Sequence, residues 1–114
     1  MLVFVYGTLK KNKHNHYLLG NSKFLGTTST NPIFSLFDGP FPIAETQGST
    51  SIHGEVYDVN DETLEKLRIL EGVDLGWYKE LKVNTDLGEC IMYVQDKGKS
   101  GRTLTNLLTD GIWN

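Results

Sequence analysis

The first ten residues contain the feature that most constrains the fold, an uninterrupted apolar segment that ends at a glycine. Residues 2–6 read Leu-Val-Phe-Val-Tyr, with no polar position among them. A strand that is covered on both faces has this pattern, so the segment predicts a strand inside a sheet. Gly7 follows directly. Because glycine permits backbone angles and close approaches that a side chain forbids, the chain is expected to turn there.

The turn after this strand is a candidate binding site for an anion. Thr8, Leu9 and Lys10 leave the predicted sheet with several backbone N–H groups that have no strand partner. A turn lined by successive N–H groups is concave and partly positive, and it suits a carboxylate or a phosphate. A buried strand would hold such a turn rigidly. The alternative interpretation is an ordinary first strand followed by a turn that binds nothing.

Length and composition favour one small folded unit. The 114 residues predict a single domain, 1–114, and 39% apolar with 22% charged residues is ordinary for a globular protein. A net charge of −3 argues against nucleic acid as the main partner. The sequence contains no apolar run of the roughly 20 residues that span a bilayer and only one cysteine, Cys90. We therefore expect a cytoplasmic protein without a membrane segment. A monomer is favoured, but the sequence leaves the oligomeric state open.

Periodicity and turn residues predict short strands, one clear helix and two weaker ones. A short helix is expected at residues 14–19 and a last one at 103–108, while Asn60 and Gly72 are suited to begin and end the clear helix. Strands are expected at residues 23–30, 33–37, 52–59, 79–84 and 89–95, the last two as a hairpin. Residues 41–45 contain a proline, which suits a loop or an edge strand, and 97–102 are expected to form a loop.

The phase of the clear helix places a carboxyl group on its apolar side. At about 100° per residue, Leu64, Leu67 and Glu71 fall within about 60° of one another. A carboxylate that faces inward is costly unless it is protonated, paired or used, and burial raises its pKa. Glu71 is therefore a candidate general acid/base. The alternative is that Glu71 merely pairs with Arg68 or with a neighbouring backbone amide.

Together, these residues resemble a known family, the γ-glutamylcyclotransferase-like proteins, which include γ-glutamylamine cyclotransferases and their AIG2-like relatives. The matching blocks occur in family order from residue 3 to about residue 95. They are Tyr-Gly-Thr-Leu at residues 6–9, Asn-His at 15–16, Leu-Leu at 18–19, Gly-Glu-Val-Tyr at 54–57, Glu-Gly at 71–72, Trp-Tyr at 77–78 and Tyr-Val at 93–94. A Tyr-Gly-Thr-Leu alone is a weak motif, but its combination with Glu-Gly at the end of the right helix is fairly specific.

The resemblance implies an α+β fold, a small mixed β-barrel with a few short helices packed around it. It also implies a reaction in which the α-amine of a small γ-glutamyl compound attacks its own γ-carbonyl, forming 5-oxoproline and releasing an amine or amino acid. Neither a metal nor an organic cofactor is required. By the same resemblance Glu71 is the acid/base, and the substrate-binding residues are Tyr6, Gly7, Thr8, Leu9, Tyr78 and Tyr93. Core tyrosines with hydrogen-bonded hydroxyl groups are the alternative reading of the last two.

Two points stay open at the level of sequence. Arg68 stands where many relatives have an acidic residue, and beside Glu71 it would lower the pKa of the carboxyl and weaken it as a base. The rival function is therefore a non-catalytic module that binds a small metabolite or a protein with the same cavity. The leaving amine is not specified, and selectivity is expected to come from the loops 38–42 and 72–77 and from the C-terminal tail.

Overall fold

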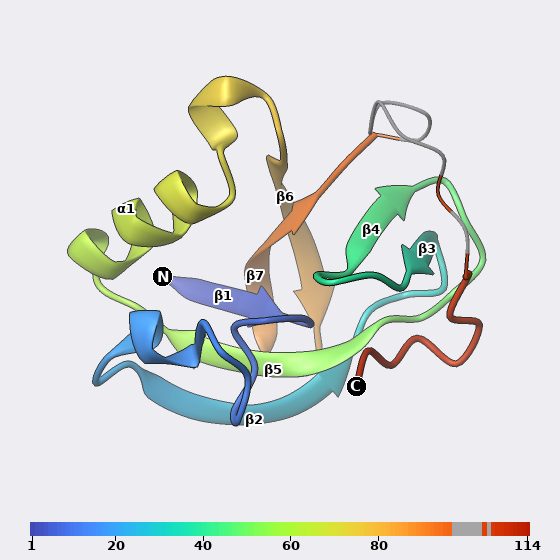
Figure 1. The fold of residues 1–114 in the computed structure, drawn as a ribbon. Coiled ribbons are helices and arrows are strands. Elements are labelled where there is room, and N and C mark those ends of the chain that lie inside the picture. The colour runs from blue at the N-terminus through green and yellow to red at the C-terminus, as the bar shows by residue number, and fades with distance from the viewer. Residues whose placement is uncertain (97–103, 105) are drawn as a thin grey trace.

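The apolar N-terminal segment forms the central strand of the main sheet. The computed structural model describes residues 1–96, 104 and 106–114. β1 (Leu2–Val5) lies between β5 (His53–Asp58), to which it is antiparallel, and β7 (Gly88–Val94), to which it is parallel. β2 (Lys23–Ser29) and β6 (Lys79–Thr85) are the outer strands, which gives the order β2-β5-β1-β7-β6 (Figure 1). The prediction of an interior first strand is confirmed.

A separate two-stranded ribbon packs beside this sheet. β3 (Phe34–Phe37) pairs with β4 (Ile43–Thr46), and a single parallel bridge between Glu45 and Gln95 ties the ribbon to the end of β7. Residues 43–46 are therefore a strand, and Pro42 lies just before it. The α+β class is confirmed. The strands of the described residues form an open five-stranded sheet and a ribbon, and they show no closed barrel.

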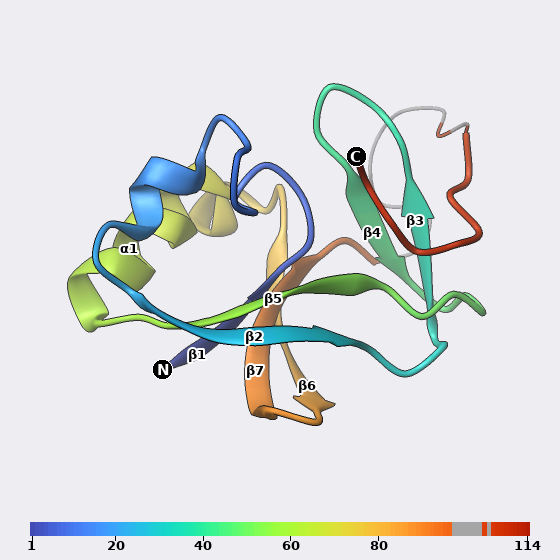
Figure 2. The same cartoon turned by 90° about the horizontal axis from the view of Figure 1, so that it is seen from below.

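Both faces of β1 are buried, because residues alternate between two apolar clusters. Phe4 and Tyr6 belong to the cluster that includes the ribbon, whereas Val3 and Val5 belong to the cluster beneath the helix. α1 (Asp61–Leu70) covers this second cluster together with the 3-10 turn η1 (His16–Leu19). In both ribbon views, α1 and the β3–β4 ribbon lie on opposite sides of the molecule (Figures 1 and 2).

The helix predictions have mixed outcomes. α1 begins as expected, since the Asn60 side chain accepts a hydrogen bond from the Thr63 N–H at 2.8 Å, and Gly72 follows its end in a left-handed conformation. The helix expected at 14–19 is only the four-residue η1. A second 3-10 turn, η2 (Val73–Leu75), follows α1. The hairpin of β6 and β7 is confirmed.

The predicted helix at 103–108 is wrong for the residues of that segment that the structure describes. Leu107 instead forms a bridge with Phe37, and the Leu108 N–H bonds to the Leu36 carbonyl. Leu107 and Leu108 therefore pair with strand β3 of the ribbon and do not form the face of a helix. The expected loop at 97–102 lies outside the described residues. No helix in the described part of the chain has the length and apolar character to cross a membrane.

Candidate active site

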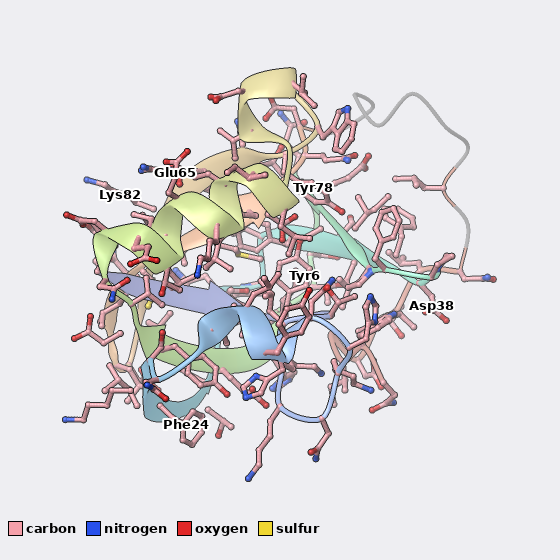
Figure 3. All side chains as sticks on the ribbon, turned by 60° about the vertical axis from the view of Figure 1, so that its left-hand side comes forward. Tyr6, Phe24, Asp38, Glu65, Tyr78 and Lys82 are labelled. Atoms are coloured by element: carbon pink, nitrogen blue, oxygen red, sulfur yellow. The ribbon has the colours of Figure 1, made fainter. Side chains whose placement is uncertain are left out.

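A cavity of about 250 Å³ opens beyond the C-terminal end of β1. All the residues that the sequence nominated as a site line this one cavity. Tyr6 and Tyr78, from opposite halves of the chain, lie near each other by the C-terminal end of α1 (Figure 3). The lining residues are Phe4, Val5, Tyr6, Gly7, Thr8, Leu9, His14, Asn15, Phe41, Pro42, Leu70, Glu71, Trp77, Tyr78 and Tyr93.

Gly7 is required here for close approach rather than for an unusual backbone angle. Its φ is not positive, but a Cβ added to it would lie 2.4 Å from Cγ and 2.8 Å from Cδ of Pro42. Because the proline ring is rigid, it cannot move aside as a flexible side chain would. Gly7 therefore lets the turn after β1 lie directly against the segment that precedes β4.

The turn at residues 7–9 is braced through its carbonyl groups. The carbonyl of Gly7 accepts from the Lys10 N–H at 3.0 Å, and the carbonyl of Thr8 accepts from the Asn15 N–H at 3.0 Å. The Asn15 side chain also donates to Thr8 Oγ1 at 3.0 Å, and His16 Nδ1 lies 2.9 Å from the Leu9 carbonyl. These contacts hold the turn against residues 10–16.

The N–H groups of the same turn are not used in this way. Among the hydrogen bonds of the described residues, none has the backbone N–H of Gly7, Thr8 or Leu9 as its donor. Unpaired N–H groups at the wall of a cavity are rare and are suited to an anionic ligand. The turn therefore has the donors that a carboxylate needs.

Glu71 is the residue that immediately follows α1, and its carboxyl group faces the same cavity. Its backbone N–H still bonds to the Leu67 carbonyl at 2.9 Å, so the helix holds it in place. Burial raises the pKa of the Glu71 carboxyl to about 7. Within the described part of the chain, no hydrogen bond or ion pair to this carboxyl offsets that effect. A carboxyl in this state can exchange a proton near neutral pH.

The alternative in which Glu71 pairs with Arg68, and Arg68 lowers its pKa, is wrong. The Arg68 guanidinium instead bonds to Glu80 on β6 through Nε at 2.8 Å and through Nη2 at 3.3 Å. That pairing lowers the pKa of Glu80 and leaves the pKa of Glu71 to be set by burial. Arg68 therefore pairs with the edge strand β6, whereas Glu71 lines the cavity.

The three tyrosines form walls of the cavity and donate their hydroxyl protons to the protein. Tyr6 donates to the Tyr93 carbonyl at 2.6 Å, Tyr93 donates to Glu80 Oε2 at 2.9 Å, and Tyr78 donates to the Pro42 carbonyl at 3.1 Å. Burial raises the pKa of Tyr6 and, together with Glu80, that of Tyr93. All three side chains line the pocket and their hydroxyl groups are hydrogen-bonded within the protein, and a substrate-binding role for Tyr78 and Tyr93 stays a prediction.

Several lining residues were not nominated individually. Phe41, Pro42 and Trp77 lie in the two loops expected to give selectivity, but nothing in their local pattern shows that they face Glu71. Asn15 was part of a matching block, yet its hydrogen bonds to Thr8 are visible only in the folded chain. In the part of the chain that the structure describes, no three His, Cys, Asp or Glu side chains gather as a metal site.

Comparisons with known proteins identify the family of this chain. A family model described as γ-glutamyl cyclotransferase, AIG2-like, matches residues 3–114. A Vibrio cholerae protein, provisionally named a γ-glutamylcyclotransferase, is 38% identical over 113 residues, which cover 98% of this chain and 94% of that protein. The γ-glutamylcyclotransferase family protein YtfP of Escherichia coli K12 is 32% identical over 115 residues, with 99% and 96% of the two chains covered.

Solved structures show the same fold. The solution structure of Escherichia coli ytfP has a TM-score of 0.76 and 32% identity, and covers 99% of this chain and 96% of that one. The crystal structure of a mouse AIG2-like protein has a TM-score of 0.83 at 20% identity, with 99% and 87% covered, which supports the fold alone. The family match over nearly the whole chain, joined to these relatives, places this protein in the γ-glutamyl cyclotransferase, AIG2-like family.

Proposed function

We propose that this protein converts the γ-glutamyl group of a small γ-glutamyl amine or amino acid to 5-oxoproline, with Glu71 as general acid/base. One observation supports this function most directly. A turn with unpaired N–H groups and a carboxyl group with a pKa of about 7 line the same cavity. At about 250 Å³, the cavity lies below the roughly 300–1,000 Å³ typical of drug-sized ligands, so it suits an amino-acid head group.

The proposed reaction needs little more than these two elements. The N–H groups of Gly7, Thr8 and Leu9 hold the substrate's α-carboxylate, and Glu71 in its ionised form takes a proton from the α-ammonium group. The free amine then attacks the γ-carbonyl carbon of the same molecule, forming the new C–N bond of the ring. Fixing both ends of one molecule makes this attack effectively unimolecular, which replaces a protein nucleophile.

Collapse of the intermediate completes the cycle. The bond between the γ-carbon and the leaving nitrogen breaks, and Glu71 returns its proton to that nitrogen. The second proton of the attacking nitrogen also passes to the leaving amine, so the products are 5-oxoproline and the amine as its ammonium ion, and the enzyme regains its starting protonation state. A positioned acid/base of this kind accelerates a reaction by about 10² to 10⁴. The raised pKa of Glu71 suits both proton transfers near neutral pH.

The test is the substitution Glu71→Gln, which keeps the size of the side chain and removes its proton exchange. We expect 5-oxoproline release from γ-glutamyl amines and peptides to fall by about 10² to 10⁴, measured by mass spectrometry. Glu62→Gln is the matched control, because Glu62 lies on the exposed side of the same helix. Unchanged turnover in Glu71→Gln removes this residue from the mechanism. An intact bound ligand without 5-oxoproline from the wild-type protein identifies a binding module instead.

A further inference from the structure

Three ring side chains are the solvent-exposed part of the cavity lining that the structure describes. Of the fifteen lining residues in the described ranges, only His14, Phe41 and Trp77 are exposed, and the others are buried or half-buried. Trp77 exposes 62% of its surface and Phe41 exposes 43%. Exposed apolar rings that cluster around a cavity are typical of a binding surface, whereas scattered ones are ordinary.

Each ring lies beside a residue that shapes the proposed head-group site. Phe41 directly precedes Pro42, whose ring packs on Gly7. Trp77 packs on Gly72, because a Cβ there would lie 2.4 Å from Trp77 Cε3, and Gly72 directly follows Glu71. Phe41 and Trp77 are therefore exposed rings that adjoin the residues proposed to hold the head group.

The third ring is placed by the loop that braces the turn. His14 Nε2 lies 3.3 Å from Nδ2 of Asn15, and the same Asn15 side chain holds Thr8. In the proposed reaction, the α-amino-acid head of the substrate lies between the turn and Glu71. The γ-amide nitrogen and the leaving group attached to it then extend outward between these rings.

The charges of the residues that line the cavity limit which leaving groups the substrate can carry. Among the fifteen lining residues that the structure describes there is no lysine or arginine, and Glu71 is the only carboxyl group. Among these described residues, a second carboxylate on the substrate has no permanent cation to pair with, and a distant ammonium group has no carboxylate other than the acid/base. A charge that loses water without gaining a partner is costly.

We propose that His14, Phe41 and Trp77 form a leaving-group subsite that selects γ-glutamyl amides of uncharged apolar or aromatic amines. This proposal rests on the proposed function. Apolar and aromatic bodies gain contact with the rings when they leave water, and aromatic ones also gain favourable ring geometry. The rings and the missing charges thus favour the same class of amine.

Two matched pairs of substrates test the proposal. The γ-glutamyl amide of phenethylamine differs from γ-glutamyl-phenylalanine by one carboxylate. The γ-glutamyl amide of hexylamine differs from that of 1,5-diaminopentane by a terminal methyl in place of an ammonium group. We expect the uncharged member of each pair to have at least a roughly tenfold higher kcat/KM for 5-oxoproline release.

Variants of the rings then locate the selectivity. Trp77→Ala and Phe41→Ala are each expected to reduce the ratio of kcat/KM within both pairs by several-fold. Trp77 also packs beside the Glu71 segment, but a displaced Glu71 slows both members of a pair alike, so the ratio still reports the subsite. Leu75→Ala is the control, because Leu75 is 70% exposed in the same segment and does not line the cavity. It should leave the ratios unchanged.

The outcomes separate this inference from the proposed function. Equal rates within both pairs, or faster release from the charged members, overturn the subsite while 5-oxoproline formation still supports the cyclotransferase. If no substrate yields 5-oxoproline, the proposed function fails, and calorimetry with the same pairs on the wild-type protein still tests the subsite. Tighter binding of the uncharged members supports it, and equal or weaker binding overturns it.

Discussion

Glu71 combines two properties that a single residue seldom has, a fixed backbone and an ionisable group without a partner among the residues that the structure describes. The last turn of α1 fixes its backbone, while its carboxyl lies at a largely apolar cavity wall. Burial raises the pKa of this carboxyl to about 7 from an ordinary value of 4.5. Between these two pH values the folded protein holds a proton that the unfolded chain has lost, so this residue makes stability fall as the pH rises from about 4.5 to 7.

Glu71→Gln should therefore change stability in a pH-dependent way. Since glutamine cannot ionise, we expect the variant to match the wild type near pH 4 and to be more stable above pH 7. One pKa unit corresponds to about 1.4 kcal/mol, so the gain at pH 8 is on the order of 2 kcal/mol, allowing for partial contact with water. Urea denaturation across this pH range measures it. A constant difference between the two proteins at all pH values contradicts the explanation.

At the scale of elements, α1 links the core to the site. Leu64 and Leu67 are 5% and 0% exposed, and both pack in the cluster with Val3 and Val5 of the central strand. Glu71 follows one turn after Leu67 and accordingly points to the same side of the helix. The buried face of α1 therefore sets the direction of the acid/base, and the opposite face carries exposed charges such as Glu62 and Lys66.

Truncation of Leu67 tests this link. Leu67→Ala removes buried methyl groups and leaves a cavity, so we expect it to lower the free energy of unfolding by about 2–5 kcal/mol. Ile69→Ala is the matched control in the same helix, because Ile69 is 71% exposed and should change stability by about 0.5 kcal/mol or less. Urea midpoints give both values. Similar losses in the two variants would mean that α1 is not held through this face.

At the scale of the whole molecule, the C-terminal segment joins two loops that line the cavity. Trp113 Nε1 donates to Asp38 Oδ1 at 3.0 Å, and Lys10 Nζ donates to the Trp113 carbonyl at 2.6 Å. Lys13 Nζ lies 5.1 Å from the centre of the Trp113 ring. Asp38 begins the loop that contains Phe41, and Lys10 follows the turn at residues 7–9. Trp113 therefore ties together two walls of the site that are far apart in sequence.

A double-mutant cycle on Trp113 and Asp38 measures this tie. Trp113→Phe keeps an aromatic ring and removes the N–H donor, whereas Asp38→Ala removes the acceptor. We expect a coupling of about 1 kcal/mol in the free energy of unfolding, since this hydrogen bond has a charged acceptor and is partly buried. Additive losses from the two substitutions would show that the indole contributes by packing alone.

The sequence by itself determined the local elements and the candidate groups. An apolar residue at every position identified residues 2–6 as an interior strand. The cap at Asn60 and the helical phase of Leu64 and Leu67 identified α1 and showed that Glu71 lies on its inward side. These features depend on residues within one or two turns of each other, so their physical causes can be read from adjacent positions. The nomination of Tyr6, Tyr78 and Tyr93 came from a family resemblance instead.

Only the tertiary structure decided which of these groups meet. Arg68 pairs with Glu80, Gly7 touches Pro42, and Trp113 reaches Asp38, all across long stretches of chain. Residues 106–108 run along the ribbon rather than forming a helix, because pairing with β3 overrides their local preference. The physical reason is common to all these cases. Charge pairing, close approach and strand pairing depend on distances in space, and the packing of the sheet, the helix and the ribbon sets those distances.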